Sequence, residues 1–96
     1  MDELERLRQE IDGIDRELAS AFERRMKVAG RIGLVKAKSG AAVLDEAREQ
    51  AVLESRRGYI DDSALLPYWE EELKCLMKLS RDYQWTLRED FPSLKK

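Results

Sequence analysis

The sequence predicts an all-α protein with three helices per chain: one very long N-terminal helix, a short second helix and a long third helix. The chain has 96 residues, of which 40% are charged and 43% are hydrophobic, and it contains only five glycines and two prolines. A composition rich in charged helix formers and poor in Gly and Pro is typical of long amphipathic helices. The length indicates one domain over residues 1–96, with a core from about 4 to 90.

The first helix is predicted by apolar residues that recur every three or four positions. This seam consists of Leu4, Leu7, Ile11, Ile14, Leu18, Ala21, Arg25, Val28, Ile32 and Val35. Nine of its ten positions are apolar, and the repeat of 3.5 residues is that of a helix with one buried stripe. We therefore expect one helix from about Asp2 to Lys38, which Ser39 and Gly40 end.

Shorter signals define the other two helices. Asp45 can cap a second helix that runs to about Arg57. The third helix is expected to begin within residues 63–67, because Pro67 is tolerated only in a first turn. We expect Cys75 to be a packed thiol. The apolar face of the third helix comprises Trp69, Leu73, Leu76, Ser80, Tyr83 and Leu87. The residues expected to pack in the core or in a dimer interface are Tyr68, Trp69, Tyr83, Trp85 and Phe91.

The length of the first helix bears on the assembly. About 36 residues at 1.5 Å each give a rod of roughly 54 Å. A compact chain of this size has a radius of gyration of only about 12–13 Å. The rod therefore extends past the core of one chain, and a second copy would cover its apolar seam. We expect an intertwined homodimer, although a helical hairpin or a plain coiled coil explains the seam equally well.

Composition excludes several classes of function. The chain has no histidine and one cysteine, which excludes Ser-His and Cys-His nucleophiles and argues against a zinc site. A single cysteine also fits a cytoplasmic protein. The net charge of −2 gives no general attraction to nucleic acid or to an anionic membrane. No apolar stretch reaches the roughly 18 residues of a membrane span, and the N-terminus does not resemble a signal peptide.

Two cations on the first helix are candidate binding residues. Arg25 occupies a seam position where an aliphatic side chain is expected, and Lys36 lies eleven residues later. Eleven residues are almost three turns, so the two cations share a face with Ala29 and Ile32. Such a face suits a small dianion that has a hydrocarbon ring. The alternatives are a salt bridge from Arg25 to a glutamate, an Arg25 that bends out to solvent, and a solvated Lys36 at the helix end.

Polar residues on the other two helices are further candidates. Ser80 and Gln84 lie one turn apart on the third helix and can offer neutral hydrogen-bond donors. Arg48 and Glu49 open the second helix, close to Asp45. Each also has a purely structural explanation. Ser80 can bond back to its own helix, Glu49 can complement the helix dipole, and Arg48 can be solvated.

These residues lie within a pattern of motifs that runs through all three helices. The pattern consists of an LRxxIDxID run at residues 7–15, Arg24–Arg25–Met26, Ile32–Gly33 with Lys36 three residues on, VxDxxRE at residues 43–49, and Ser80 with Gln84. In order, spacing and residue type it resembles the AroQ-class, all-helical chorismate mutases over nearly the whole chain.

The resemblance implies a function as well as a fold. It implies a single chorismate mutase domain over residues 1–96, working as a homodimer with active sites shared between subunits. The reaction is the rearrangement of chorismate to prephenate in phenylalanine and tyrosine biosynthesis, without cofactor or metal. One departure is Ala42, where many members have proline, which puts the rigidity of that loop in question. Residues 56–67 match poorly, and no function is assigned to them.

The resemblance also implies a role for each matching residue. Arg25 and the partner subunit's Arg8 bind the two carboxylates of the substrate. Lys36 binds a carboxylate and the ether oxygen of the breaking bond, and Gln84 donates to that same oxygen. By the same resemblance, Arg48 supports the site and Ser80 lies near a carboxylate. Glu49 and the backbone near Asp45 contact the ring hydroxyl.

Helix geometry supports a shared site independently. Arg8 and Arg25 are separated by roughly 25 Å along one helix. One helix therefore cannot bring both to a ligand of the size of chorismate, whereas an antiparallel partner helix can bring its own Arg8 to this Arg25.

Two other functions remain open at this point. An isochorismate-pyruvate lyase on the same fold has a similar first helix, and Glu49 favours the mutase because a hydroxyl partner beside Arg48 suits chorismate. A non-catalytic helical dimerisation module is the third candidate, and it would not need Arg25 on the seam. The sequence also leaves open whether the chain is free-standing or part of a bifunctional enzyme.

Overall fold

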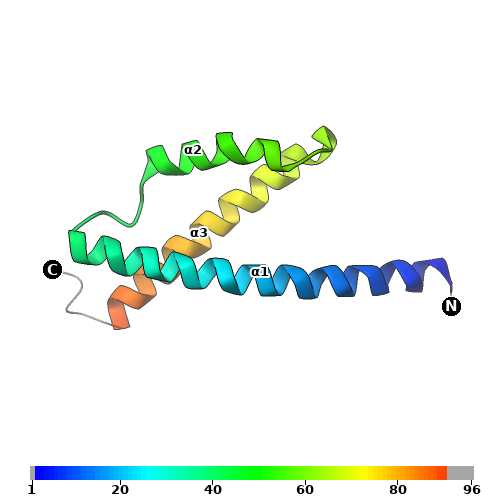
Figure 1. The fold of residues 1–96 in the computed structure, drawn as a ribbon, viewed down its shortest axis with the longest axis horizontal. Coiled ribbons are helices and arrows are strands. Elements are labelled where there is room, and N and C mark those ends of the chain that lie inside the picture. The colour runs from blue at the N-terminus through cyan, green and yellow to red at the C-terminus, as the bar shows by residue number, and fades with distance from the viewer. Residues whose placement is uncertain (1, 91–96) are drawn as a thin grey trace.

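The computed structural model describes residues 2–90, with side chains through residue 88. Three α-helices dominate it: α1 (Glu3–Ser39), α2 (Glu46–Arg56) and α3 (Leu66–Asp90). Two short 3-10 helices, η1 (Arg57–Tyr59) and η2 (Ser63–Leu65), connect α2 to α3. Residues 2–90 contain no strand, so the all-α fold with a very long first helix, a short second and a long third is confirmed (Figure 1).

Local capping defines both ends of α1. The Asp2 carboxylate accepts a hydrogen bond of 2.8 Å from the Glu5 amide, which satisfies a backbone donor of the first turn. At the other end Gly40 has a φ of 76°, in the left-handed region that glycine adopts without steric penalty. The Ala41 amide then donates to the Lys36 carbonyl at 2.9 Å. The helix ends one residue beyond the expected Lys38.

The start of α2 and the start of α3 also follow from single residues. The Asp45 carboxylate caps α2 by accepting from the Arg48 amide at 2.9 Å. Pro67 is the second residue of α3, within the first turn, as expected. The second helix ends at Arg56, close to the expected Arg57, and the chain continues as η1 from Arg57 through Gly58.

Helix α3 crosses the C-terminal half of α1 at a stripe of small residues (Figure 1). The buried residues of α1 are Ala29, Gly30, Gly33 and Ala37. A Cβ atom on Gly33 would lie 2.6 Å from Cγ of Gln84, so glycine is required for this approach. The apolar core beyond this stripe consists of Val43, Val52, Leu73 and Met77.

The N-terminal half of α1 extends away from α2 and α3 (Figure 1). The chain measures 58 × 28 × 14 Å and its radius of gyration is 17.0 Å, well above the roughly 12–13 Å of a compact chain of this length. Within the described chain the large apolar side chains of this half are 41–61% exposed. We call them the N-terminal stripe: Leu4, Leu7, Ile11, Ile14, Leu18 and Phe22. The expected extension of the rod past the core is confirmed.

The buried face of the third helix is not the one expected from its apolar spacing. Met77 and Gln84 are buried, whereas Leu76 is half-buried and Tyr83 is exposed. The reason is that α3 packs on the small-residue stripe of α1 and on α2 at once, which turns its buried face toward Met77. The expectation that Cys75 is packed is wrong, because Cys75 is exposed.

The aromatic residues of α3 also differ in burial. Tyr68 and Trp85 are exposed on the single chain, so they do not belong to its core. Trp69 is half-buried, and its indole Nε1 donates to the Arg56 carbonyl at 3.0 Å. Phe91 lies outside the described residues.

In the described residues no helix is both long and apolar enough for a membrane span.

Candidate active site

An open cavity of about 1040 Å³ lies between α1, α2 and α3. Its walls include apolar side chains of all three helices, among them Ile32, Val52 and Leu73. Seven of the eight predicted site residues line it: Arg25, Lys36, Asp45, Arg48, Glu49, Ser80 and Gln84. The eighth, Arg8, does not line it and lies on the exposed half of α1. The fold therefore gathers candidates separated by up to 59 positions in the sequence.

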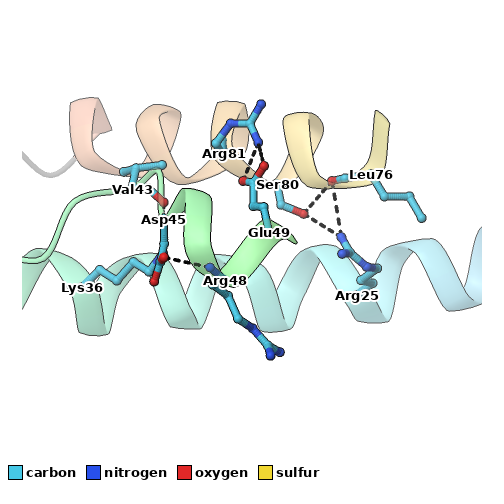
Figure 2. Close-up of polar contacts among 9 residues, drawn as sticks. All are labelled: Arg25, Lys36, Val43, Asp45, Arg48, Glu49, Leu76, Ser80 and Arg81. Carbon is cyan, nitrogen blue, oxygen red and sulfur yellow. Dashed lines mark hydrogen bonds and ion pairs between the residues drawn. The ribbon is translucent and has the colours of Figure 1, made fainter. Parts of the chain in front are cut away.

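Arg25 is anchored across the α1–α3 contact. Its Nη1 donates to Ser80 Oγ at 2.7 Å and to the Leu76 carbonyl at 3.3 Å (Figure 2). Among the described residues Arg25 forms no ion pair with a carboxylate, so the glutamate partner weighed from the sequence is not found. Burial, followed by the charge of Arg56, lowers the pKa of Arg25, although a guanidinium stays protonated at neutral pH. A half-buried cation with remaining N–H donors faces the cavity.

Ser80 supports that arginine while bonding to its own helix. Its hydroxyl donates to the Leu76 carbonyl at 2.8 Å and accepts from Arg25. The back-bonding weighed from the sequence is therefore present. It orients the hydroxyl oxygen toward Arg25, because the hydroxyl proton is already used.

Lys36 lies at the far end of the cavity and is half-buried. Its Nζ donates to the Val43 carbonyl at 2.9 Å, which ties the loop after α1 to the helix (Figure 2). The solvated lysine weighed from the sequence is not what the structure has. An ammonium carries three donors, so two remain for a ligand in the cavity.

Gln84 is the most deeply buried of the candidates, at 5% exposure. Its Nε2 donates to the Ala29 carbonyl at 2.7 Å, across the closest approach of α1 and α3. The amide nitrogen carries a second hydrogen, which leaves a neutral donor at the cavity wall. Burial in a close helix contact holds this donor in one position.

The first turn of α2 contributes the acidic side of the cavity. Asp45 and Arg48 are exposed and are joined by the capping bond, and Figure 2 shows the Arg48 side chain extending away from Asp45. Glu49 forms an ion pair with Arg81 of α3, whose Nη1 donates to both carboxylate oxygens, at 2.6 Å to Oε1.

Two cationic residues of the cavity were missed by the sequence reasoning. Arg81 follows directly after Ser80 and was not recognised, because the buried face of α3 had been assigned one position away. Arg56 lies in the stretch to which no function was assigned, and it stacks 5.5 Å from the ring of Tyr59. A scan of cations flanking Ser80 and Gln84 would have found Arg81.

The cavity concentrates positive charge on a chain whose net charge is negative. Five cations line it, Arg25, Lys36, Arg48, Arg56 and Arg81, against three acids, Asp45, Glu49 and Glu72. Such a cavity favours a small dianion. Its apolar walls and fixed hydrogen-bond donors suit catalysis by binding, orientation and electrostatic stabilisation. In the described residues no group of three or more potential metal-binding side chains occurs.

Comparison with known proteins identifies one family and several relatives. The model of the family described as chorismate mutase type II matches residues 7–85. The intracellular chorismate mutase of Mycolicibacterium smegmatis is 37% identical over 79 residues, which cover 82% of this chain and 71% of that protein. No solved structure matched at a significant level.

Two longer relatives match over a shorter range. The T-protein of Haemophilus influenzae is 40% identical over 57 residues, which are 59% of this chain and 15% of that protein. The bifunctional chorismate mutase/prephenate dehydratase of Aquifex aeolicus is 41% identical over 54 residues, 56% of this chain and 15% of that protein. The matched region thus spans 15% of each of these two relatives. Since the family match covers most of the helical fold described above, the chain belongs to the chorismate mutase type II family, the AroQ class.

Proposed function

We propose that two copies of the chain form an intertwined homodimer that rearranges chorismate to prephenate at two sites, each shared between the subunits. The observation that carries this proposal is the common cavity of Arg25, Lys36 and Gln84, combined with the separation of Arg8 from it. Residues 1–96 act as a single chorismate mutase domain in aromatic amino acid biosynthesis. The single cysteine supports a cytoplasmic setting.

The reaction breaks the ether carbon–oxygen bond of chorismate and forms a carbon–carbon bond within the same molecule. It needs no nucleophile and no proton transfer in principle. The protein accelerates it by holding the flexible substrate in the compact arrangement where the two reacting carbons meet. The apolar walls of the cavity hold the ring, and the cations hold the two carboxylates.

Charge develops on the ether oxygen as its bond breaks. Lys36 and Gln84 are the donors proposed to stabilise that charge, the lysine as a cation and the glutamine as a neutral amide. Both side chains are already held by backbone carbonyls, Lys36 by Val43 and Gln84 by Ala29. Donors fixed before the reaction cost no reorganisation during it, which is why they favour the transition state over the substrate.

The remaining residues bind and orient the substrate. Arg25, supported by Ser80, and the partner subunit's Arg8 bind the two carboxylates. Arg48 supports the same region, and Glu49 with the backbone near Asp45 accepts the ring hydroxyl. An antiparallel partner helix provides the second arginine, because Arg8 and Arg25 of one chain are roughly 25 Å apart.

The N-terminal stripe supports the homodimer. Six large apolar side chains are about half-exposed along α1, from the projecting end at Leu4 to Leu18 and Phe22 at the edge of the cavity. Fully burying one such side chain stabilises an assembly by about 1.5–3 kcal/mol. A second copy that covers the stripe also carries its Arg8 to the cavity, so assembly and catalysis depend on the same helix.

A turnover assay tests the reaction. Purified protein is expected to consume chorismate, followed by loss of its absorbance, and to form prephenate. The same protein is expected to release no pyruvate from isochorismate, which would be the lyase reaction. Pyruvate release without loss of chorismate contradicts the mutase proposal, and absence of both activities favours the dimerisation module.

Mixing two inactive variants tests the shared site. Arg8→Ala and Arg25→Ala are each expected to be inactive as homodimers. In a mixed dimer one site keeps both arginines and the other loses both. A statistical one-to-one mixture therefore recovers about a quarter of the wild-type activity. Mass spectrometry of the intact assemblies verifies the mixed dimer, and no recovery in verified mixed dimers contradicts sharing.

A further inference from the structure

The ion pair between Glu49 and Arg81 joins α2 to α3 at the wall of the cavity. The two side chains are 26% and 28% exposed, respectively, and both line the cavity. A single nitrogen, Nη1 of Arg81, donates to both carboxylate oxygens (Figure 2). The carboxylate is thereby held on one side only, and its other lone pairs remain available for a ligand.

An acidic group is an unexpected component of a cavity that binds a dianion. A carboxylate without a cation beside it repels the carboxylates of the substrate, and low exposure strengthens that repulsion. Accepting a hydrogen bond from a ring hydroxyl nevertheless requires an acceptor oxygen at this place. Pairing with a cation outside the ligand position resolves the conflict, because the acceptor stays while its charge is compensated.

We propose that Arg81 is a positioning residue that compensates the charge of Glu49 and fixes the plane of its carboxylate, so that Glu49 can accept the ring hydroxyl of a dianionic substrate. This inference rests on the proposed function. Arg81 acts through Glu49 and does not itself contact the substrate. The contact through one nitrogen also means that an ammonium can replace the guanidinium here, unlike at a site where two nitrogens grip a carboxylate side by side.

Steady-state kinetics of Arg81→Met and Arg81→Lys test this role. Arg81→Met leaves Glu49 uncompensated in substrate complex and transition state alike, so KM is expected to rise about tenfold while kcat changes less than about threefold. Arg81→Lys is expected to restore KM to within about threefold of the wild type. A wild-type KM in Arg81→Met, or no rescue by lysine, overturns the proposal.

A double-mutant cycle separates an indirect role from direct binding. Glu49→Gln removes the charge that Arg81 compensates. In that background Arg81→Met is expected to change KM less than about twofold, although it changes KM about tenfold in the wild type. Equal effects in both backgrounds mean that Arg81 binds the substrate itself, which overturns the proposal. If Arg81→Met alone fails to fold, the double variant leaves no unpaired charge and is still compared with Glu49→Gln.

Lys78→Met is the matched control. Lys78 pairs with Asp82 on the same helix at 2.8 Å, is well exposed and does not line the cavity. Its KM is expected to stay within about twofold of the wild type, since an exposed pair contributes little. An equal rise in KM for Lys78→Met overturns a specific role for Arg81. A wild type without mutase activity overturns the proposed function and this inference with it, whereas an active wild type with an unchanged Arg81→Met variant overturns the inference alone.

Discussion

The two halves of α1 share one exposed apolar repeat, but only the C-terminal half also buries a face of small residues. The N-terminal half carries leucine, isoleucine and phenylalanine, and these are about half-exposed. The C-terminal half buries only Ala29, Gly30, Gly33 and Ala37, against α3 of the same chain. Small residues admit a helix of the same chain at close range, whereas the large residues of the repeat, Val28 and Ile32 of the packed half included, stay about half-exposed. The presence of this small-residue face thus decides which half of the helix packs within the subunit.

The same difference separates the candidate site residues. Arg25 and Lys36 belong to the packed half, where Ser80 and the Val43 carbonyl already hold them. Arg8 belongs to the exposed half and lies outside the cavity. The packed half of α1 therefore contributes to a nearly complete set of site residues. The exposed half carries Arg8, which would complete the site of a second copy.

The largest expected effect is on the packed half, at Lys36. Lys36→Ala removes a donor fixed against the ether oxygen, so kcat is expected to fall by about 10²–10³. Helicity, followed by circular dichroism, is expected to stay unchanged. Lys38→Ala is the matched control, because Lys38 is an exposed cation in the same last turn. A Lys36→Ala variant that turns over at the wild-type rate removes Lys36 from the mechanism.

The next effect is on the exposed half, at Ile11. Ile11→Glu places a charge in the N-terminal stripe, where it is expected to dissociate the homodimer and so to lower activity, since each site then lacks the second arginine. Analytical ultracentrifugation measures the mass, and the single chain is expected to stay helical. Ser20→Glu, exposed on the same helix outside the stripe, is expected to stay dimeric. An Ile11→Glu protein of unchanged mass means that another surface assembles the protein.

The smallest effect compares the same substitution in the two halves. Gly33→Ala forces a Cβ to within 2.6 Å of Gln84 Cγ, and it is expected to cost about 1–3 kcal/mol of stability and to displace the Gln84 amide. Gly13→Ala meets nothing within 4 Å on the chain and is expected to stabilise the helix by up to about 1 kcal/mol. Urea unfolding at fixed protein concentration measures both. Equal signs for the two variants contradict the contrast between the halves.

The helix ends were predictable from the sequence because short-range contacts define them. Asp2, Gly40, Asp45 and Pro67 each act within one turn of their own position, so neighbours along the chain are sufficient to identify them. The 3-10 helix η1 was not predicted, because the residues around Arg57 do not distinguish a helix that ends from one that continues as a 3-10 turn.

The buried face of α3 was predictable only in part. Apolar spacing identified Leu73 but favoured Leu76 and Tyr83 over Met77 and Gln84. A helix in contact with two neighbours buries residues on both sides of its apolar seam. The apolar spacing within that helix does not predict where those neighbours lie. The exposure of Cys75 and the pairing of Arg81 with Glu49 were missed for the same reason.

By itself the sequence determined three helices, their caps, the long apolar repeat of α1 and the residue types of the candidate site, since each depends on contacts within one or two turns. Tertiary structure alone decided that Gln84 bonds to Ala29, that Arg25 bonds to Ser80 and that Arg81 compensates Glu49. Those contacts join residues 32–55 positions apart, and only the close crossing of α1 and α3 at glycine, with α2 packed against α3, brings them within hydrogen-bond distance.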